Sequence, residues 1–141
     1  MPACAELLAM ALTTVGSMRG GAALVGDVTA AELLARWTDA TRATIYVGAI
    51  HDVVVGLAAA TVGVRAHATE PSGRIECCFV EEGARGVGVG SALMESLVAW
   101  CTQSGCHDID ALALPGDRLS KQRMEAAGFT ARLLVLNRRL N

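Results

Sequence analysis

A glycine-rich junction at residues 80–94, VEEGARGVGVGSALM, most constrains how this chain can fold. The run before it, GRIECCFV, is rich in strand formers, and the run after it has apolar residues at helical spacing. Each glycine inside regular structure costs about 0.5–1 kcal/mol relative to alanine. The junction therefore predicts a strand that passes into a helix at a place where the backbone must stay uncovered.

A helix that begins at such a junction presents unpaired N–H groups and a partial positive charge at its first turn. Without a Cβ atom in the way, a phosphate can approach those N–H groups closely. Each charge-assisted bond to a phosphate contributes about 1.5–3 kcal/mol, so several of them offset the cost of the glycines. Arg85 adds a cation to the loop. A turn that merely allows close packing of helix on sheet is the alternative that this stretch alone leaves open.

Two common phosphate-binding motifs do not fit the junction. A P-loop requires Gly-Lys-Ser/Thr, which does not follow here. A dinucleotide fingerprint requires Gly-x-Gly-x-x-Gly, and either Ser91 or Leu93 stands where the third glycine is needed. A dinucleotide-binding domain stays an alternative that the local pattern supports weakly.

Composition narrows the class of protein. The chain has 141 residues, which suits one domain spanning 1–141. Its net charge of −2 argues against nucleic acid as a partner, because phosphate tracking needs clustered cations. No apolar run reaches the roughly 20 residues that a membrane span requires, so we expect no membrane association. Charged residues make up only 18% of the chain, which favours a buried self-association face.

The cysteines indicate a reducing compartment. The sequence has five, an odd number, and none forms a CxxC pair. We therefore expect reduced thiols in a cytoplasmic protein rather than a disulfide framework. The spacing of Cys101, Cys106 and His107 does not match a tetrahedral zinc site, so no metal is predicted.

The order of predicted elements gives an α+β fold with a mixed sheet flanked by helices. A capping box at Thr29 and Glu32 marks the start of the second helix. A hairpin turns at residues 51–52, and its second strand is expected to carry a bulge at Gly56 or Gly63. The predicted helices are 5–18, 27–40, 91–105 and 118–128, and the predicted strands are 43–50, 53–68, 73–80, 108–114 and 129–140.

The junction resembles the acyl-CoA motif of the GNAT superfamily of N-acetyltransferases. The residues that carry the likeness are Arg85-x-x-Gly88-x-Gly90, after a strand that ends at Val80 and before an amphipathic helix. A second stretch, RMEAAGF at 123–129, resembles the family's closing helix-Gly-Phe signature. Together the two stretches cover residues 75–129. The resemblance implies a mostly antiparallel sheet with a splayed central strand pair, and direct transfer of acetyl from acetyl-CoA to a primary amine.

The resemblance also implies how acetyl-CoA is held. In this family the strand ending at Phe79 and Val80 splays from the next strand, and the pantetheine amides pair with main chain near Val80 and Glu82. Asp117 stands at the turn position where the family often has an asparagine that contacts CoA. Backbone N–H groups of the loop would hold the pyrophosphate, and they belong to Arg85, Gly86, Val87, Gly88, Val89, Gly90 and Ser91.

Candidate catalytic groups follow from the need to take a proton from the amine and give one to the departing sulfur. Glu76 is expected to share a strand face with Cys78 and Val80, where burial would raise its pKa toward that of a useful base. A place at the solvent end of the strand, or an ion pair with an arginine such as Arg74 or Arg65, is the alternative for Glu76.

Asp110, in the next strand, is the second candidate base. Met124 occupies the position where the family often has a tyrosine that protonates the sulfur, and a methionine has no such proton. Ser120, one turn earlier, is the candidate substitute, acting directly or through water. The missing donor keeps a second function open, that of a non-catalytic acyl-CoA-binding or regulatory module.

The ends of the chain depart from the family. The family usually opens with a strand before its first helix, and this chain begins almost at the helix. After Phe129 there is room for one strand only. We therefore expect a sheet that is short at both ends or completed by a second copy, which favours a homodimer. The sequence leaves the identity of the amine acceptor open.

Overall fold

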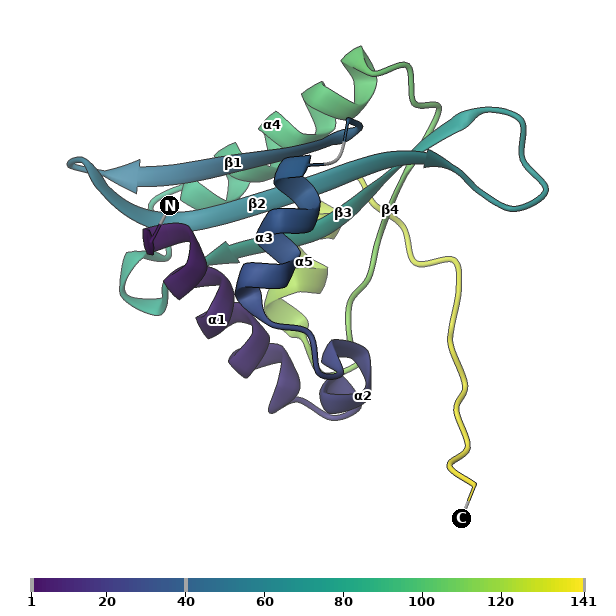
Figure 1. The fold of residues 1–141 in the computed structure, drawn as a ribbon, viewed down its shortest axis with the longest axis horizontal. Coiled ribbons are helices and arrows are strands. Elements are labelled where there is room, and N and C mark those ends of the chain that lie inside the picture. Colours follow the sequence, from purple (N-terminus) through teal and green to yellow (C-terminus); the bar gives the residue numbers. More distant parts are fainter. Residues whose placement is uncertain (1, 40, 141) are drawn as a thin grey trace.

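A computed structural model describes residues 2–39 and 41–140 (Figure 1). Its sheet has the order β1-β2-β3-β4, with the first three strands antiparallel and β4 parallel to β3. The mixed, mostly antiparallel sheet and its flanking helices confirm the predicted α+β class. The strands are β1 Ala43–Ile50, β2 Val53–Val64, β3 Pro71–Val80 and β4 Ile109–Ala111, and the helices are α1 Pro2–Gly16, α2 Gly21–Val25, α3 Ala30–Asp39, α4 Val89–Gln103 and α5 Arg118–Ala126.

The helices form layers on both faces of the sheet (Figure 1). α1 and α3 pack on one face, where Leu8 and Trp37 join Leu57 of β2 in one apolar cluster. α4 packs on the other face through Leu97 and Met94. Successive alanines of β2, residues 58–60, are fully buried between the layers, and their small side chains let both layers approach the sheet. The core therefore lies along β2 and β3.

Local features of the first half follow the sequence. The capping box forms, because Thr29 N donates to Glu32 Oε2 at 2.8 Å and Glu32 N donates to Thr29 Oγ1 at 3.2 Å. His51 and Asp52 both adopt positive φ, as a two-residue hairpin turn requires. The bulge lies beside Gly56, where the register between β1 and β2 shifts, and not at Gly63.

The predicted splay between the two central strands is present. β4 pairs only with Gly73–Ile75 of β3, so β3 continues to Val80 without a strand partner on that side among the described residues. Close packing of α4 supports the paired part, since a Cβ on Gly73 would lie 2.6 Å from Cys101 Sγ. The gap opens directly before the glycine-rich loop.

The prediction for the end of the chain is wrong. The last strand, predicted over 129–140, does not form, and residues 130–140 run away from the sheet as an irregular, exposed segment (Figure 1). The residue types in this segment favour a strand, but a strand forms only where it can pair with the edge of a sheet. Near residue 20 the structure adds the short helix α2, which lies outside the predicted helices. The expected homodimer stays a prediction.

Within the described residues, no helix is both long and apolar enough to cross a membrane.

Candidate functional site

The glycine-rich loop leaves a row of backbone donors free. Gly86 and Gly88 have φ of +87° and +91°, and a Cβ added to either would meet nothing within 4 Å. Gly88 is the N-cap of α4 and no side chain caps that helix. Among the described residues, the N–H groups of residues 86–91 donate to no protein acceptor. The loop and the first turn of α4 therefore present a set of N–H groups suited to an anion.

Arg85 joins this loop to the end of β3. Its Nε donates to the carbonyl of Val80 at 3.0 Å, and its guanidinium carbon lies 5.8 Å from the centre of the Phe79 ring. Its own N–H donates to the carbonyl of Glu82, in the short 3-10 turn Glu82–Ala84. The strand and the turn thus hold a cation next to the free N–H groups.

Arg123 of α5 reaches the same strand edge, which sequence reasoning missed. Its Nη1 donates to the carbonyl of Cys78 at 3.1 Å and lies 3.8 Å from Cys78 Sγ. Its guanidinium fills the space that a Cβ on Gly90 would need, at 2.7 Å. The only sequence signal was its place directly before Met124. Two arginines therefore cover the carbonyls of Cys78 and Val80, where β4 has left the edge of β3 open.

A cavity of about 670 Å³ runs along β3 beneath the first three helices. One end is lined by Arg85, Arg123 and the start of α5, and the other by Arg74, α2 and Leu112. Its volume falls in the range typical of small-molecule sites. The predicted site residues that line it are Glu76, Phe79, Val80, Arg85, Asp117 and Ser120.

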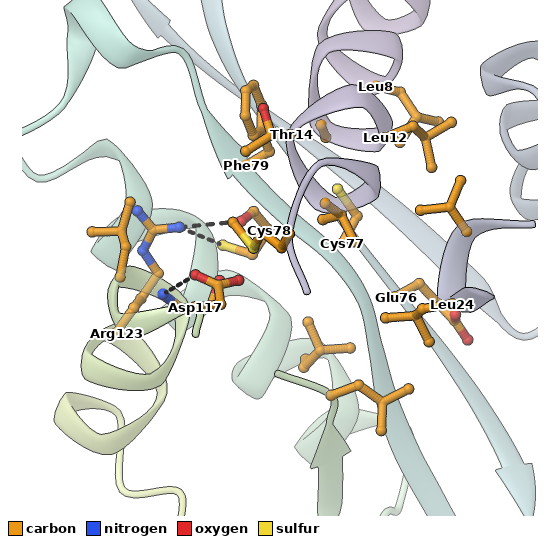
Figure 2. A pocket seen from close by; sticks show the side chains of 18 of the residues that line it. Leu8, Leu12, Thr14, Leu24, Glu76, Cys77, Cys78, Phe79, Asp117 and Arg123 are labelled. Carbon is orange, nitrogen blue, oxygen red and sulfur yellow. Dashed lines mark hydrogen bonds between the residues drawn. The ribbon is translucent and has the colours of Figure 1, made fainter. Parts of the chain in front are cut away.

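The structure corrects the expected orientation of Glu76. The register between β2 and β3 shifts so that Glu76 has no partner in β2, while Cys77 and Ile75 pair with consecutive residues. This bulge turns Glu76 to the face of Cys77, so it does not share a face with Cys78 and Val80 as predicted. Figure 2 shows Glu76 on one side of β3 and Arg123 on the other.

Glu76 has polar partners on its face of the sheet. Thr61 Oγ1 donates to Glu76 Oε1 at 2.8 Å, and Arg74 Nε lies 3.9 Å from the same oxygen. The side chain is 26% exposed. Glu76 therefore combines access to the cavity with a paired carboxylate, and the ion pair with Arg74 confirms one of the alternatives weighed from the sequence.

The neighbouring cysteines are free thiols. Burial raises the pKa of Cys77 to about 12. Burial also raises the pKa of Cys78, although the Arg123 guanidinium opposes that effect. Only the thiolate is a strong nucleophile, and burial therefore favours the less reactive thiol form of both side chains.

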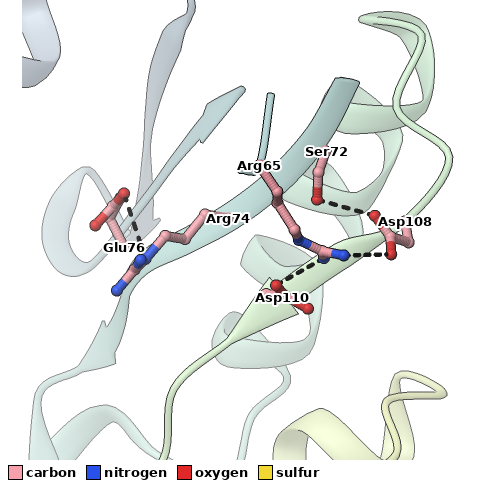
Figure 3. A network of polar contacts seen from close by, with 6 residues as sticks. All are labelled: Arg65, Ser72, Arg74, Glu76, Asp108 and Asp110. Carbon is pink, nitrogen blue, oxygen red and sulfur yellow. Dashed lines mark hydrogen bonds and ion pairs between the residues drawn. The ribbon is translucent and has the colours of Figure 1, made fainter. Parts of the chain in front are cut away.

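Asp110 lies outside the cavity. Its carboxylate lies 2.6 Å from Arg65 Nη2, and Arg65 Nη1 donates to Asp108 at 3.0 Å (Figure 3). Ser72 Oγ donates to the other oxygen of Asp108 at 2.9 Å. The Asp110 side chain is 62% exposed, so this network joins β4 to the end of β2 at the surface. The structure does not bring the second candidate base to the other site residues.

Asp117 and Ser120 lie at the start of α5. Asp117 Oδ1 accepts the N–H of Ser120 at 3.1 Å, which caps the helix. Ser120 and Met124 both line the cavity, on the same side as Arg123. In the described part of the chain, no group of three or more His, Cys, Asp or Glu side chains is arranged to hold a metal ion.

Comparison with solved structures gives the same fold. A tetramutant of a protein from Bacillus halodurans superposes with a TM-score of 0.83 at 13% identity, over 99% of this chain and 93% of that chain. The aminoglycoside acetyltransferase meta-AAC0020, from an uncultured soil metagenomic sample and in complex with sisomicin, gives 0.72 at 15% identity, over 99% and 86%. AAC(6')-Iy, in complex with a bisubstrate analogue built on CoA, gives 0.65 at 23% identity, over 82% and 83%.

The sequence itself identifies the family. A search of curated proteins found no match. The family model described as acetyltransferase (GNAT) family matches residues 21–129, which hold the sheet, the glycine-rich loop and the closing helix. The chain belongs to the GNAT acetyltransferase family.

Proposed function

We propose that this protein is an N-acetyltransferase that moves an acetyl group from acetyl-CoA to a primary amine of a small-molecule or peptidyl acceptor. The observation that carries the proposal is the row of free N–H groups at residues 86–91, beside the gap between β3 and β4. These N–H groups suit the diphosphate of CoA. The structural neighbour AAC(6')-Iy is in complex with a CoA-based bisubstrate analogue in one structure and with CoA in another, which supports this ligand.

The open edge of β3 suits the arm of the donor. Among the described residues, the side chains that donate to the carbonyls of Cys78 and Val80 in the gap are those of Arg123 and Arg85, so these carbonyls offer acceptors to the amide N–H groups of pantetheine. Arg85 and Arg123 then turn from these carbonyls toward negative charge on the donor. The thioester comes to lie near Cys78, where the gap meets the cavity.

In the reaction the amine nitrogen attacks the thioester carbonyl carbon and the carbon–sulfur bond breaks. Glu76 takes the proton that the amine loses, because it is the carboxylate that faces the cavity from the central strand. The sulfur departs with negative charge. Arg123 stabilises that charge in place of the acid that Met124 cannot supply, and Ser120 remains the candidate proton donor.

The test is acetyl transfer by the purified protein with a panel of primary amines. Product is detected by mass, which reports the acetylated amine directly. We expect Glu76→Gln to lower turnover by about 10²–10⁴-fold, the usual contribution of a general base. Asp110→Asn, which changes a carboxylate outside the cavity, should leave turnover within a few-fold of the parent.

A non-catalytic acyl-CoA-binding module is the second candidate function, favoured by Met124 at the position of the missing acid. It predicts a saturable rise in melting temperature with acetyl-CoA but no acetylated product with any amine. A rise with NADH and none with CoA would contradict both functions and favour a dinucleotide site.

A further inference from the structure

The charged side chains that line the cavity limit which amines it can bind. Its acidic side chains are Glu76 and Asp117, and its other charged side chains are arginines. Asp117 already accepts the N–H of Ser120, and Glu76 accepts the hydroxyl of Thr61 beside Arg74. Along this cavity no carboxylate is left without a partner to hold an additional ammonium group.

The wall opposite β3 is largely apolar, and its polar lining residues are Thr14 of α1 and Arg36 of α3. α1, α2 and α3 contribute Leu12, Leu24 and Leu33 to the lining, one from each helix. Figure 2 shows Leu12 and Leu24 on the same side of β3 as Glu76, away from Arg123 and Asp117. This end of the cavity therefore offers one carboxylate, paired with Arg74, in a largely hydrophobic surface.

We propose that the acceptor is a primary monoamine with an apolar body, and this rests on the proposed function. Its amino group faces Glu76, and its body packs against the leucines of the first three helices. A second ammonium on the same molecule would be partly desolvated among those leucines, in a lining that carries Arg36 and Arg74 and no unpaired carboxylate, which is unfavourable. Polycations such as polyamines and aminoglycosides are therefore poor acceptors for this cavity.

The experiment compares n-hexylamine with 1,6-diaminohexane, which has the same carbon chain and one more amino group. We expect kcat/KM for acetylation to be at least about tenfold higher with n-hexylamine, although the diamine has two reactive ends. Spermidine should be acetylated more slowly still. Equal or faster acetylation of the diamine or of spermidine would overturn the inference while leaving the proposed function standing.

A pair of variants tests whether the cavity wall sets this preference. Leu24 is 51% exposed and lines the cavity, so Leu24→Glu adds a carboxylate at a place that tolerates charge. We expect this variant to lower the ratio of kcat/KM for n-hexylamine to kcat/KM for 1,6-diaminohexane by at least several-fold. Val53→Glu is the control, because Val53 is 61% exposed and lies outside the cavity.

Melting temperatures of both variants show whether they are folded. If the Leu24→Glu variant does not fold, the comparison of the two amines on the parent protein tests the inference alone. If a folded Leu24→Glu variant keeps the same ratio of kcat/KM values, the wall formed by the first three helices does not contact the body of the amine. No acetylation of any amine would overturn the proposed function and this inference together.

Discussion

Replacing Gly88 with alanine tests the anion site at the head of α4. Gly88 has φ of +91°, and an added methyl group meets nothing within 4 Å. The substitution therefore creates no clash in the free protein. It has two separable effects, a strained backbone and a methyl group among the free N–H groups.

The strain acts on stability and the methyl group acts on affinity. A non-glycine residue in the left-handed region costs about 1–2 kcal/mol, which lowers the melting temperature of a domain this size by about 3–8 °C. The strain is present with and without ligand, so it cancels from the dissociation constant. Loss of one charge-assisted N–H bond to a phosphate costs about 1.5–3 kcal/mol, so Kd for CoA rises about 10- to 150-fold.

Gly83→Ala is the matched control within the same segment. Gly83 has an ordinary φ and open space around it, so alanine should leave CoA affinity unchanged and stabilise the fold by about 0.4–1 kcal/mol. Calorimetric titration with CoA and thermal unfolding of the three proteins give both quantities. If folded Gly88→Ala protein binds CoA as tightly as the parent, the loop does not grip the diphosphate and our reasoning is wrong.

Two further changes test other parts of the structure. Arg123→Gln removes the cation beside Cys78 and should lower kcat in steady-state assays by about 10²-fold. Arg123→Lys should recover part of the lost kcat, because it restores the positive charge. An unchanged kcat in Arg123→Gln would exclude a role for this charge in the reaction. Asp108 accepts hydrogen bonds from Ser72 and Arg65, which hold the pKa of its carboxyl below the ordinary value. The bond from Ser72 has the larger effect. Its ionised form therefore stabilises the fold above the ordinary pKa of about 4, and this contribution is lost as the pH falls through the lowered pKa. We expect Asp108→Asn to cost at most about 1 kcal/mol at pH 7, because the pair is exposed, and progressively less as the pH falls below about 4, as measured by urea unfolding. A cost that does not change with pH would contradict this role of Asp108.

The parts of the site that depend on backbone conformation could be predicted from the sequence. Gly86 and Gly88 adopt the positive φ that their residue type suggests, and the strand and helix on either side form nearly where predicted. The capping box at Thr29 and Glu32 is equally local, since both hydrogen bonds lie within four residues. In these cases the physical cause and its effect are neighbours in the chain.

Features that depend on pairing between distant segments could not be predicted. The face of Glu76 is set by the bulge opposite β2, and a shift of one residue in a strand moves a side chain to the opposite face. The segment 130–140 has strand-forming residues but lies apart from the edge that would pair with it. Arg123 contacts Cys78 across 45 residues of sequence, and no local pattern encodes that contact.

The open edge of β3 links the loop to the rest of the proposed mechanism. Cys78 and Val80 would offer their carbonyls to the donor, and in the free protein Arg123 and Arg85 already occupy them. In the proposed binding mode both arginines leave these carbonyls, so binding gives up two charge-assisted bonds of about 1.5–3 kcal/mol each. The free N–H groups of residues 86–91 pay no such cost, because they have no protein partner to give up. The loop must then supply most of the net affinity for the donor, while the released guanidiniums become available for the charge that develops on sulfur.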